Sequence, residues 1–534
     1  MSTRANANAV TTVPALALSS TSPVSQIEFA TLAILCGVLA AGAYFCFPLY
    51  DDGWLALVLR ESGPHFLAQQ MGDRPVFGFL LEQVGRFGAA NRFVFVLLNS
   101  GLWLTFAVES GLLFRRLFPE LGNYSVVAAC LTLAPIVLQT QLSTALVVIP
   151  ANLATIFGYA AILLLLQQRP AKKSNKLLIL GVASALAAFG VVLSEYGVAT
   201  NLVGCALLIG MALTRPGSVG GVRRQLLISA GWLFGLTVAA YLIFAKTADF
   251  STRPDVAPGQ LVQRGAAKWL GLPFELVAGT WHAVVGAYAV ALGSVTVAWD
   301  SKSTLAGVLF GFLIAILVYF ATQGPEPETT FGDRTGQLFF RLMVFLPAIF
   351  IGLLPFSVMG RPTVLLEFGS RFRIPVMPVA AAITVALAIT LVRRPLRWIP
   401  VMMFGFIVGY ASWTFTYSAI QQSRAISALR VALRPYVAQS GGYTVAVVPF
   451  DRFETELTAN IAAAWPVEME KKLWVVGEGP ARSEFGNRSD CHSNTSIDVN
   501  VRGLTRMGKL DDLLWLDTTA GKPVSIEQYC TSAK

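Results

Sequence analysis

The strongest constraint on this chain is the recurrence of long apolar stretches along most of its 534 residues. An apolar stretch of about 18 or more residues is long enough to cross a hydrocarbon core of roughly 30 Å as an α-helix. The composition agrees, because 55% of the residues are hydrophobic and only 13% are charged. This is too apolar for a soluble globular chain of ordinary composition. We therefore expect a mainly α, polytopic protein embedded in a lipid bilayer.

Hydropathy predicts about eleven transmembrane helices, with a twelfth in question. The eleven segments lie near residues 29–49, 92–113, 123–140, 146–167, 177–194, 198–213, 225–245, 304–322, 338–356, 375–392 and 398–418. The open case is Leu276 to Trp299, which is apolar enough to span but would, by crossing, reverse every later helix. We read 262–299 as an interfacial or re-entrant element, with a true crossing as the alternative.

Basic residues set the predicted orientation. Clusters of Lys and Arg are cytoplasmic by the positive-inside rule, and the turns at 141–145 and 195–197 contain neither residue. The clusters are Arg115/Arg116, Arg169/Lys172/Lys173/Lys176, Arg215/Arg223/Arg224 and Arg393/Arg394/Arg397. The net charge of +10 is spread over short loops, so it reports orientation rather than nucleic-acid binding. We expect a multi-pass protein of the plasma (bacterial inner) membrane, with the loops 50–91 and 360–375 extracytoplasmic.

Three regions follow from composition. Residues 1–27 form a flexible tail, 28–420 the transmembrane domain, and 421–534 a small soluble extracytoplasmic α/β domain. The change begins near Ser418, with a helix-like stretch (419–437), an amphipathic stretch (453–472) and the β-rich runs "YTVAVVPF", "KLWVVGEG" and "DDLLWLDTT". Cys491 and Cys530 lie in the last region, where a disulfide would fit an oxidising exterior and two free thiols are the alternative.

An acid pair, Asp51 and Asp52, follows the first predicted helix, which we read as a retained anchor from Glu28 to Tyr50. Neighbouring helical positions point about 100° apart, so at most one of the two carboxylates is expected to act as a base. The alternative is that one of them caps an interfacial helix that runs from Leu55 to Arg60.

Acids and arginines alternate with apolar residues on the same predicted face, in "GDRPVFGFLLEQVGRF", "LSEYG" and "GRPTVLLEFGSRFRIP". Interfacial helices in the loop 50–91 would roof a cavity at the bilayer surface. Such a cavity suits a substrate with a lipid tail and a polar head.

This pattern resembles the GT-C superfamily of integral-membrane glycosyltransferases. The residues that carry the resemblance are Asp51-Asp52-Gly53, Asp73-Arg74-Pro75 and Ser194-Glu195-Tyr196-Gly197, and the likeness of architecture covers most of 28–420. The "DDG" triplet is similar to the first-loop acid motif of mycobacterial arabinosyltransferases, and much of the rest looks like the uncharacterised and O-antigen-modifying branches. The C-terminal region matches no sugar-binding β-sandwich of the family, which leaves the acceptor open.

The resemblance implies transfer of one sugar from a polyprenyl-phosphate monosaccharide to a hydroxyl of a cell-envelope glycan or glycolipid. The donor, the acceptor and the lipid bilayer are the expected partners, without nucleic acid. Asp52 or Asp51 would act as general base, with inversion at the anomeric carbon. Retention would need a second carboxylate about 5 Å away, and Glu195 is the candidate for it.

Further site residues are predicted on the same face. Arginine stabilises the charge of a departing phosphate through paired hydrogen bonds, and the candidates are Arg361, Arg371 and Arg373, with anchoring at lipid headgroups as the alternative. The candidates for substrate binding are His65, Asp73, Arg74, Glu195 and Tyr196. Asp73 and Arg74 could instead form a local ion pair, and Glu195, at a tight turn, is expected to hold a sugar hydroxyl or an arginine.

No metal site and no cofactor are expected, because the three histidines are scattered and no metal-binding motif is present. A divalent cation at Asp51 or Asp52 is a second option that the resemblance disfavours. Two other functions compete. A lipid-linked saccharide flippase or transporter would need ionisable groups near mid-membrane, and a non-catalytic envelope scaffold would make the acid pair dispensable.

Overall fold

The computed structural model of the protein describes most of the helical region and the strands that follow it. The described residues are 25–45, 65, 74–88, 92–133, 149–167, 173–214, 220–248, 270–286, 288, 301–323, 331–359, 368–439 and seven strands between 444 and 524. Within this part of the chain, ten helices are long and apolar enough to cross a membrane. The predicted polytopic helical architecture is therefore confirmed.

The helices occur in the order that hydropathy predicts. Their bounds are α1 (Gln26–Phe45), α4 (Pro75–Gly88), α5 (Arg92–Leu117), α6 (Ser125–Thr132), α8 (Ile149–Leu166), α9 (Lys173–Leu193), α10 (Glu195–Thr214), α11 (Gly220–Thr247), α13 (Leu272–Trp281), α15 (Ser301–Ala321), α16 (Phe331–Val358), α17 (Met377–Leu391) and α18 (Trp398–Gln439). Shorter turns are η1 (Pro119–Tyr124), the π-helical η3 (His282–Gly286), η5 (Phe368–Val376) and η6 (Arg394–Leu396).

Two predicted segments are described only in part. The third predicted helix, 123–140, is represented by α6, and 134–148 lie outside the described residues. The element predicted over 262–299 contains α13 and η3, which pack against α16 and α17, and 289–300 lie outside the described residues. Its interfacial or re-entrant character stays a prediction.

Strands follow the last helix. A five-stranded sheet has the order β2 (Val467–Glu468), β3 (Leu473–Gly477), β1 (Thr444–Val448), β6 (Leu514–Asp517), β7 (Lys522–Val524), and β4 (Ser496–Val501) pairs with β5 (Leu504–Lys509). Strand β1 runs parallel to both neighbours, with Val445 opposite Trp474 and Trp515. Each of the three β-rich runs of the sequence contains a strand, whereas the α/β character of the whole region stays a prediction, as does the Cys491–Cys530 disulfide, which lies outside the described residues.

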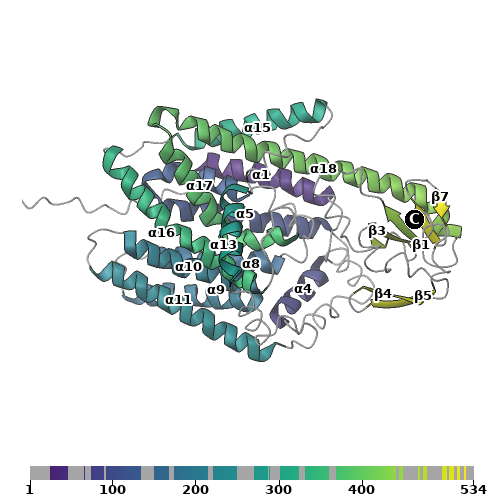
Figure 1. Ribbon diagram of the computed structural model, residues 1–534, viewed down its shortest axis with the longest axis horizontal. Coiled ribbons are helices and arrows are strands. Elements are labelled where there is room, and N and C mark those ends of the chain that lie inside the picture. The colour runs from purple at the N-terminus through teal and green to yellow at the C-terminus, as the bar shows by residue number, and fades with distance from the viewer. Residues whose placement is uncertain are drawn as a thin grey trace, which may run out of the picture.

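Helix α18 is longer than a single membrane crossing. The sequence predicts a membrane helix over 398–418 and a helix-like stretch over 419–437, and α18 covers both in 42 continuous residues. The second stretch contains one proline, Pro435, and no glycine before Gln439. Figure 1 shows α18 extending from the helix bundle to the strands, at the end of the bundle where α4 also lies.

Glycines allow α15 and α18 to pack closely. A Cβ at Gly405 would lie 2.8 Å from Cα of Ala315, and a Cβ at Gly409 would lie 2.9 Å from Cβ of Ile314. Across the interface, a Cβ at Gly311 would lie 2.9 Å from the Phe406 ring. Small residues drive helix association in membranes because they let backbones approach. Both helices carry them at a spacing of four residues, which explains this contact.

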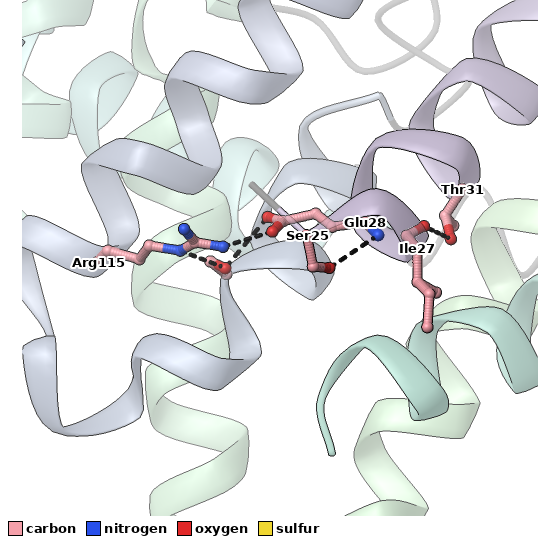
Figure 2. Close-up of polar contacts among 6 residues, drawn as sticks. Ser25, Ile27, Glu28, Thr31 and Arg115 are labelled. Atoms are coloured by element: carbon pink, nitrogen blue, oxygen red, sulfur yellow. Dashed lines mark hydrogen bonds and ion pairs between the residues drawn. The ribbon is translucent and has the colours of Figure 1, made fainter. Parts of the chain in front are cut away.

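Ion pairs tie several helices together at the other end of the bundle from α4. Figure 2 shows Glu28 and Arg115 pointing toward each other, from the start of α1 and the end of α5. Arg115 Nε also donates to Ser125 Oγ at 2.9 Å, and Ser125 Oγ donates to Glu28 Oε1 at 3.2 Å. Arg341 of α16 donates to both carboxylate oxygens of Glu120, at 2.7 and 2.6 Å. These charges are buried or half-buried, so each depends on its partner.

The glycine contact gives a first prediction. Gly405→Val should lower the free energy of unfolding by about 2 kcal/mol or more, because the new side chain meets the α15 backbone rather than a movable side chain. Thermal unfolding of the purified protein in detergent measures the change.

Gly231→Val is the matched control, because a Cβ at Gly231 of α11 has no atom within 4 Å. Equal stability of the two variants would contradict the proposed close contact.

Candidate functional site

The turn between α9 and α10 brings a carboxylate to the α4 end of the bundle. Ser194 directly follows α9, and its hydroxyl lies 3.4 Å from the backbone N of Tyr196 and 3.3 Å from Oε2 of Glu195. Glu195 occupies the first turn of α10, where the helix dipole favours a negative charge. Glycine is required beside it, because a Cβ at Gly197 would lie 2.1 Å from the carbonyl of Gly190. The predicted tight turn with a charge is thus present.

Arg74 meets this carboxylate from a distant part of the sequence. Its Nη1 lies 3.6 Å from Oε2 of Glu195, and the two side chains are 20% and 19% exposed. The guanidinium of Arg74 also stacks over the Phe77 ring at 4.9 Å. Glu195 therefore holds an arginine, one of the two partners expected for it. Asp73, the alternative partner of Arg74, lies outside the described residues.

Tyr196 leads from this ion pair into an aromatic cluster. Its ring lies 5.3 Å from Phe356 of α16 and 6.2 Å from Phe372 of η5, centroid to centroid, and the two phenylalanines are 5.1 Å apart. Tyr196, Phe356 and Phe372 are all buried. Three separate elements therefore meet at one apolar surface directly beside a charged pair.

Arg373 follows Phe372 and is completely buried, with 0% exposure. Its Nη1 donates to the backbone carbonyl of His282 at 3.1 Å, which links η5 to η3. Headgroup anchoring, the alternative for this residue, would require an exposed guanidinium. Complete burial excludes that alternative for Arg373 and leaves a site or packing role.

His65 pairs with a different acid, Glu82 of α4. Its Nδ1 is 3.5 Å from Oε1 of Glu82, which also pairs with Arg86 one turn along α4, and the His65 side chain is 71% exposed. Glu82 is a buried acid at this end that the sequence reasoning did not single out. The four-residue spacing of Glu82 and Arg86 on an amphipathic helix is the signal that could have found it.

Four predicted site residues lie outside the described part of the chain: Asp51, Asp52, Asp73 and Arg361. Arg371 lies in η5, but its side chain is outside what the structure describes. Their roles stay predictions. Asp51 and Asp52 follow the end of α1 in sequence, and α1 starts beside the end of α5.

The chain is similar to a solved structure. The crystal structure of ArnT from Cupriavidus metallidurans bound to undecaprenyl phosphate aligns with 86% of this chain and 91% of that chain, at 14% identity and a TM-score of 0.36. No family model matches the chain, and no curated protein matches it significantly. Residue roles are therefore argued from the contacts of this chain.

The described residues contain no group of three His, Cys, Asp or Glu that could hold a metal ion. The cysteines described, Cys36, Cys130 and Cys205, are free and buried in helices, as a small apolar side chain would be. The described side chains at the α4 end include carboxylates, guanidinium groups and aromatic rings.

The pairing of Arg74 with Glu195 gives a second prediction. Arg74→Glu should destabilise the protein, because it places two carboxylates together, and the exchange Arg74→Glu with Glu195→Arg should recover most of the loss. We expect a coupling free energy of about 1 kcal/mol, since the pair is only partly shielded from water.

Thermal unfolding of the two single variants and the double variant completes the cycle. Strictly additive effects would show that the two side chains do not interact.

Proposed function

We propose that the protein is a membrane glycosyltransferase that moves a single sugar from a polyprenyl-phosphate monosaccharide to a hydroxyl of a cell-envelope glycan or glycolipid. The observation that carries the proposal is the meeting of Arg74–Glu195, the ring of Tyr196 and the buried Arg373 at one end of an apolar bundle. A lipid-linked sugar phosphate has an apolar chain, an anion and a polyhydroxylated ring. These parts match the apolar bundle, the buried arginine and the polar pair, respectively.

Arg373 would stabilise the negative charge of the departing phosphate. When the sugar leaves, the bond between its anomeric carbon and the phosphate oxygen breaks, and the electron pair stays on that oxygen. A guanidinium stabilises this charge without being deprotonated, and more strongly in a water-poor site. Arg373 is completely buried and directly follows Phe372 of the aromatic cluster, which supports this role. We assign Arg361 and Arg371 to the same phosphate, on the sequence alone.

A carboxylate would activate the acceptor hydroxyl, which is the nucleophile. The acceptor hydroxyl attacks the anomeric carbon while a base removes its proton, and a positioned carboxylate contributes typically 10²- to 10⁴-fold to such a step. We assign this base to Asp52 or Asp51, and attack opposite the departing phosphate gives inversion. Glu195 is engaged by Arg74, which favours a binding role for it over that of a second nucleophile. A sugar hydroxyl can still bond to the outer face of this pair.

A lipid-linked saccharide flippase is the second candidate, favoured by one buried acid. Glu109 lies within α5, about two turns before its end, and is only 7% exposed. Its Oε2 has no hydrogen-bond partner in the part of the chain that the structure describes. The sequence places Glu109 near a helix end, but the structure buries it in the bundle, and an intramembrane acid is a common feature of transport pathways.

A transfer assay tests the proposed chemistry. Purified protein should move radiolabelled sugar from a panel of polyprenyl-phosphate monosaccharides to envelope glycolipid acceptors, and Asp52→Asn or Asp51→Asn should reduce kcat by a hundredfold or more. The amide keeps the shape and a capping oxygen but cannot accept the proton.

Asp333→Asn is the control, because it makes the same chemical change on the face that the predicted topology makes cytoplasmic. Full activity of both Asp51→Asn and Asp52→Asn would refute the base assignment. Movement of the labelled lipid across vesicles without any sugar transfer would favour the flippase.

Arg373 gives a separate prediction about binding. Arg373→Gln should raise the Kd for polyprenyl phosphate about tenfold or more, because hydrogen bonds to a charged group contribute about 1.5–3 kcal/mol. Arg373→Lys should weaken binding by less, since it keeps the charge and loses the paired donors.

Binding of a labelled polyprenyl phosphate in detergent measures both variants. Arg224→Gln, an exposed arginine of α11, is the control. An unchanged Kd in Arg373→Gln would remove Arg373 from the donor site.

A further inference from the structure

Two prolines leave a backbone carbonyl without its usual partner inside the bundle. Pro375 lies in η5 and Pro378 in the first turn of α17. In a 3₁₀ turn the carbonyl of Pro375 would accept from the N–H of residue 378, but proline has no N–H. The α-helical hydrogen bonds of α17 begin with the carbonyl of Val376, its N-cap residue. None of them therefore uses the carbonyl of Pro375. A buried carbonyl in this position needs a donor from elsewhere.

Tyr159 supplies that donor from another helix. Its hydroxyl donates to the carbonyl oxygen of Pro375 at 2.5 Å, across 216 positions of sequence. Tyr159 lies in α8 and is 0% exposed, and its ring packs against Phe106 of α5 at 5.9 Å between centroids. The side chain is therefore fixed by packing on one side and by this hydrogen bond on the other.

Two side chains of η5 make further contacts with neighbouring elements. Phe372 packs against Tyr196 and Phe356, and Arg373 donates to the carbonyl of His282. Those two contacts hold side chains, whereas Tyr159 holds the backbone itself. A shift of the Pro375 peptide would move the start of α17 and, two residues earlier, the Cα from which Arg373 projects.

We propose that Tyr159 is a positioning residue of the donor site: its hydroxyl fixes the η5 backbone, and thereby the placement of the Arg373 guanidinium on the phosphate of the lipid donor. The inference rests on the proposed function. Tyr159 does not touch the substrate in this scheme. It acts by removing alternative positions of η5, so that binding energy is not spent on ordering the segment.

The test is the variant Tyr159→Phe, which removes one oxygen and keeps the ring packing. The Kd for polyprenyl phosphate and the KM for the donor should both rise about tenfold, while kcat changes by less than about threefold. Binding of the phosphate-free polyprenol should not change. In an Arg373→Gln background the effect on the Kd should largely vanish, because the two residues act on one contact.

Tyr410→Phe is the matched control. Tyr410 is a buried tyrosine of α18 that stacks on Phe406, away from η5. A second variant guards against poor folding of Tyr159→Phe: adding Pro378→Ala restores an N–H three residues after Pro375 and should recover part of the affinity.

The outcomes separate the two hypotheses. If the wild type neither binds polyprenyl phosphate nor transfers sugar, the proposed function is overturned and this inference with it. If the wild type binds and Arg373→Gln weakens binding, but Tyr159→Phe has the Kd of Tyr410→Phe and changes only the unfolding temperature, the positioning role alone is overturned. A raised Kd that is additive with Arg373→Gln overturns it as well.

Discussion

A hydrocarbon environment offers no hydrogen bonds to the polypeptide backbone, and the structure depends on how this demand is met. Ten long helices meet it internally. In the described residues, η5 is one place where the regular pattern is interrupted, by Pro375 and Pro378, and where side chains bond to backbone carbonyls instead. The hydroxyl of Tyr159 bonds to the Pro375 carbonyl, and the guanidinium of Arg373 bonds to the His282 carbonyl. The segment that carries the candidate phosphate ligand Arg373 is thus held to its neighbours through these backbone carbonyls.

Charge is sorted to the two ends of the bundle. At one end, Glu28–Arg115 and Glu120–Arg341 join α1, α5, η1 and α16. At the other, Arg74–Glu195 joins α4 to α10, and Glu82 pairs with Arg86 and His65. The alternating topology predicted from Lys and Arg puts the first set with the basic clusters and the second set on the opposite side, so the helix order and the charge pairs agree with each other. Which compartment each end faces stays a prediction.

Hydropathy predicted about eleven membrane helices, and ten candidate spans are present in the described residues. It also predicted the turn at Glu195. Both predictions depend on local sequence: the length of an apolar run, and a charge where two runs meet. It did not predict Tyr159, which looks like any tyrosine in an apolar helix, because its partner lies 216 positions away. It predicted helix on both sides of Ser418, and the structure joins the two stretches in one helix, α18. Glu195 was expected to hold an arginine or a sugar, but only the structure identifies Arg74. The roles of Asp51 and Asp52 rest on sequence alone.

The continuity of α18 gives the strands a mechanical relation to the membrane. At 1.5 Å per residue, its 42 residues measure about 63 Å, roughly twice the thickness of a hydrocarbon core. Its last residue, Gln439, lies five positions before Thr444, the first residue of β1. A long flexible linker would let the strands sample many distances and directions. A continuous helix instead limits how far β1 can move from the bundle, and Pro435 marks a position where the helix can bend.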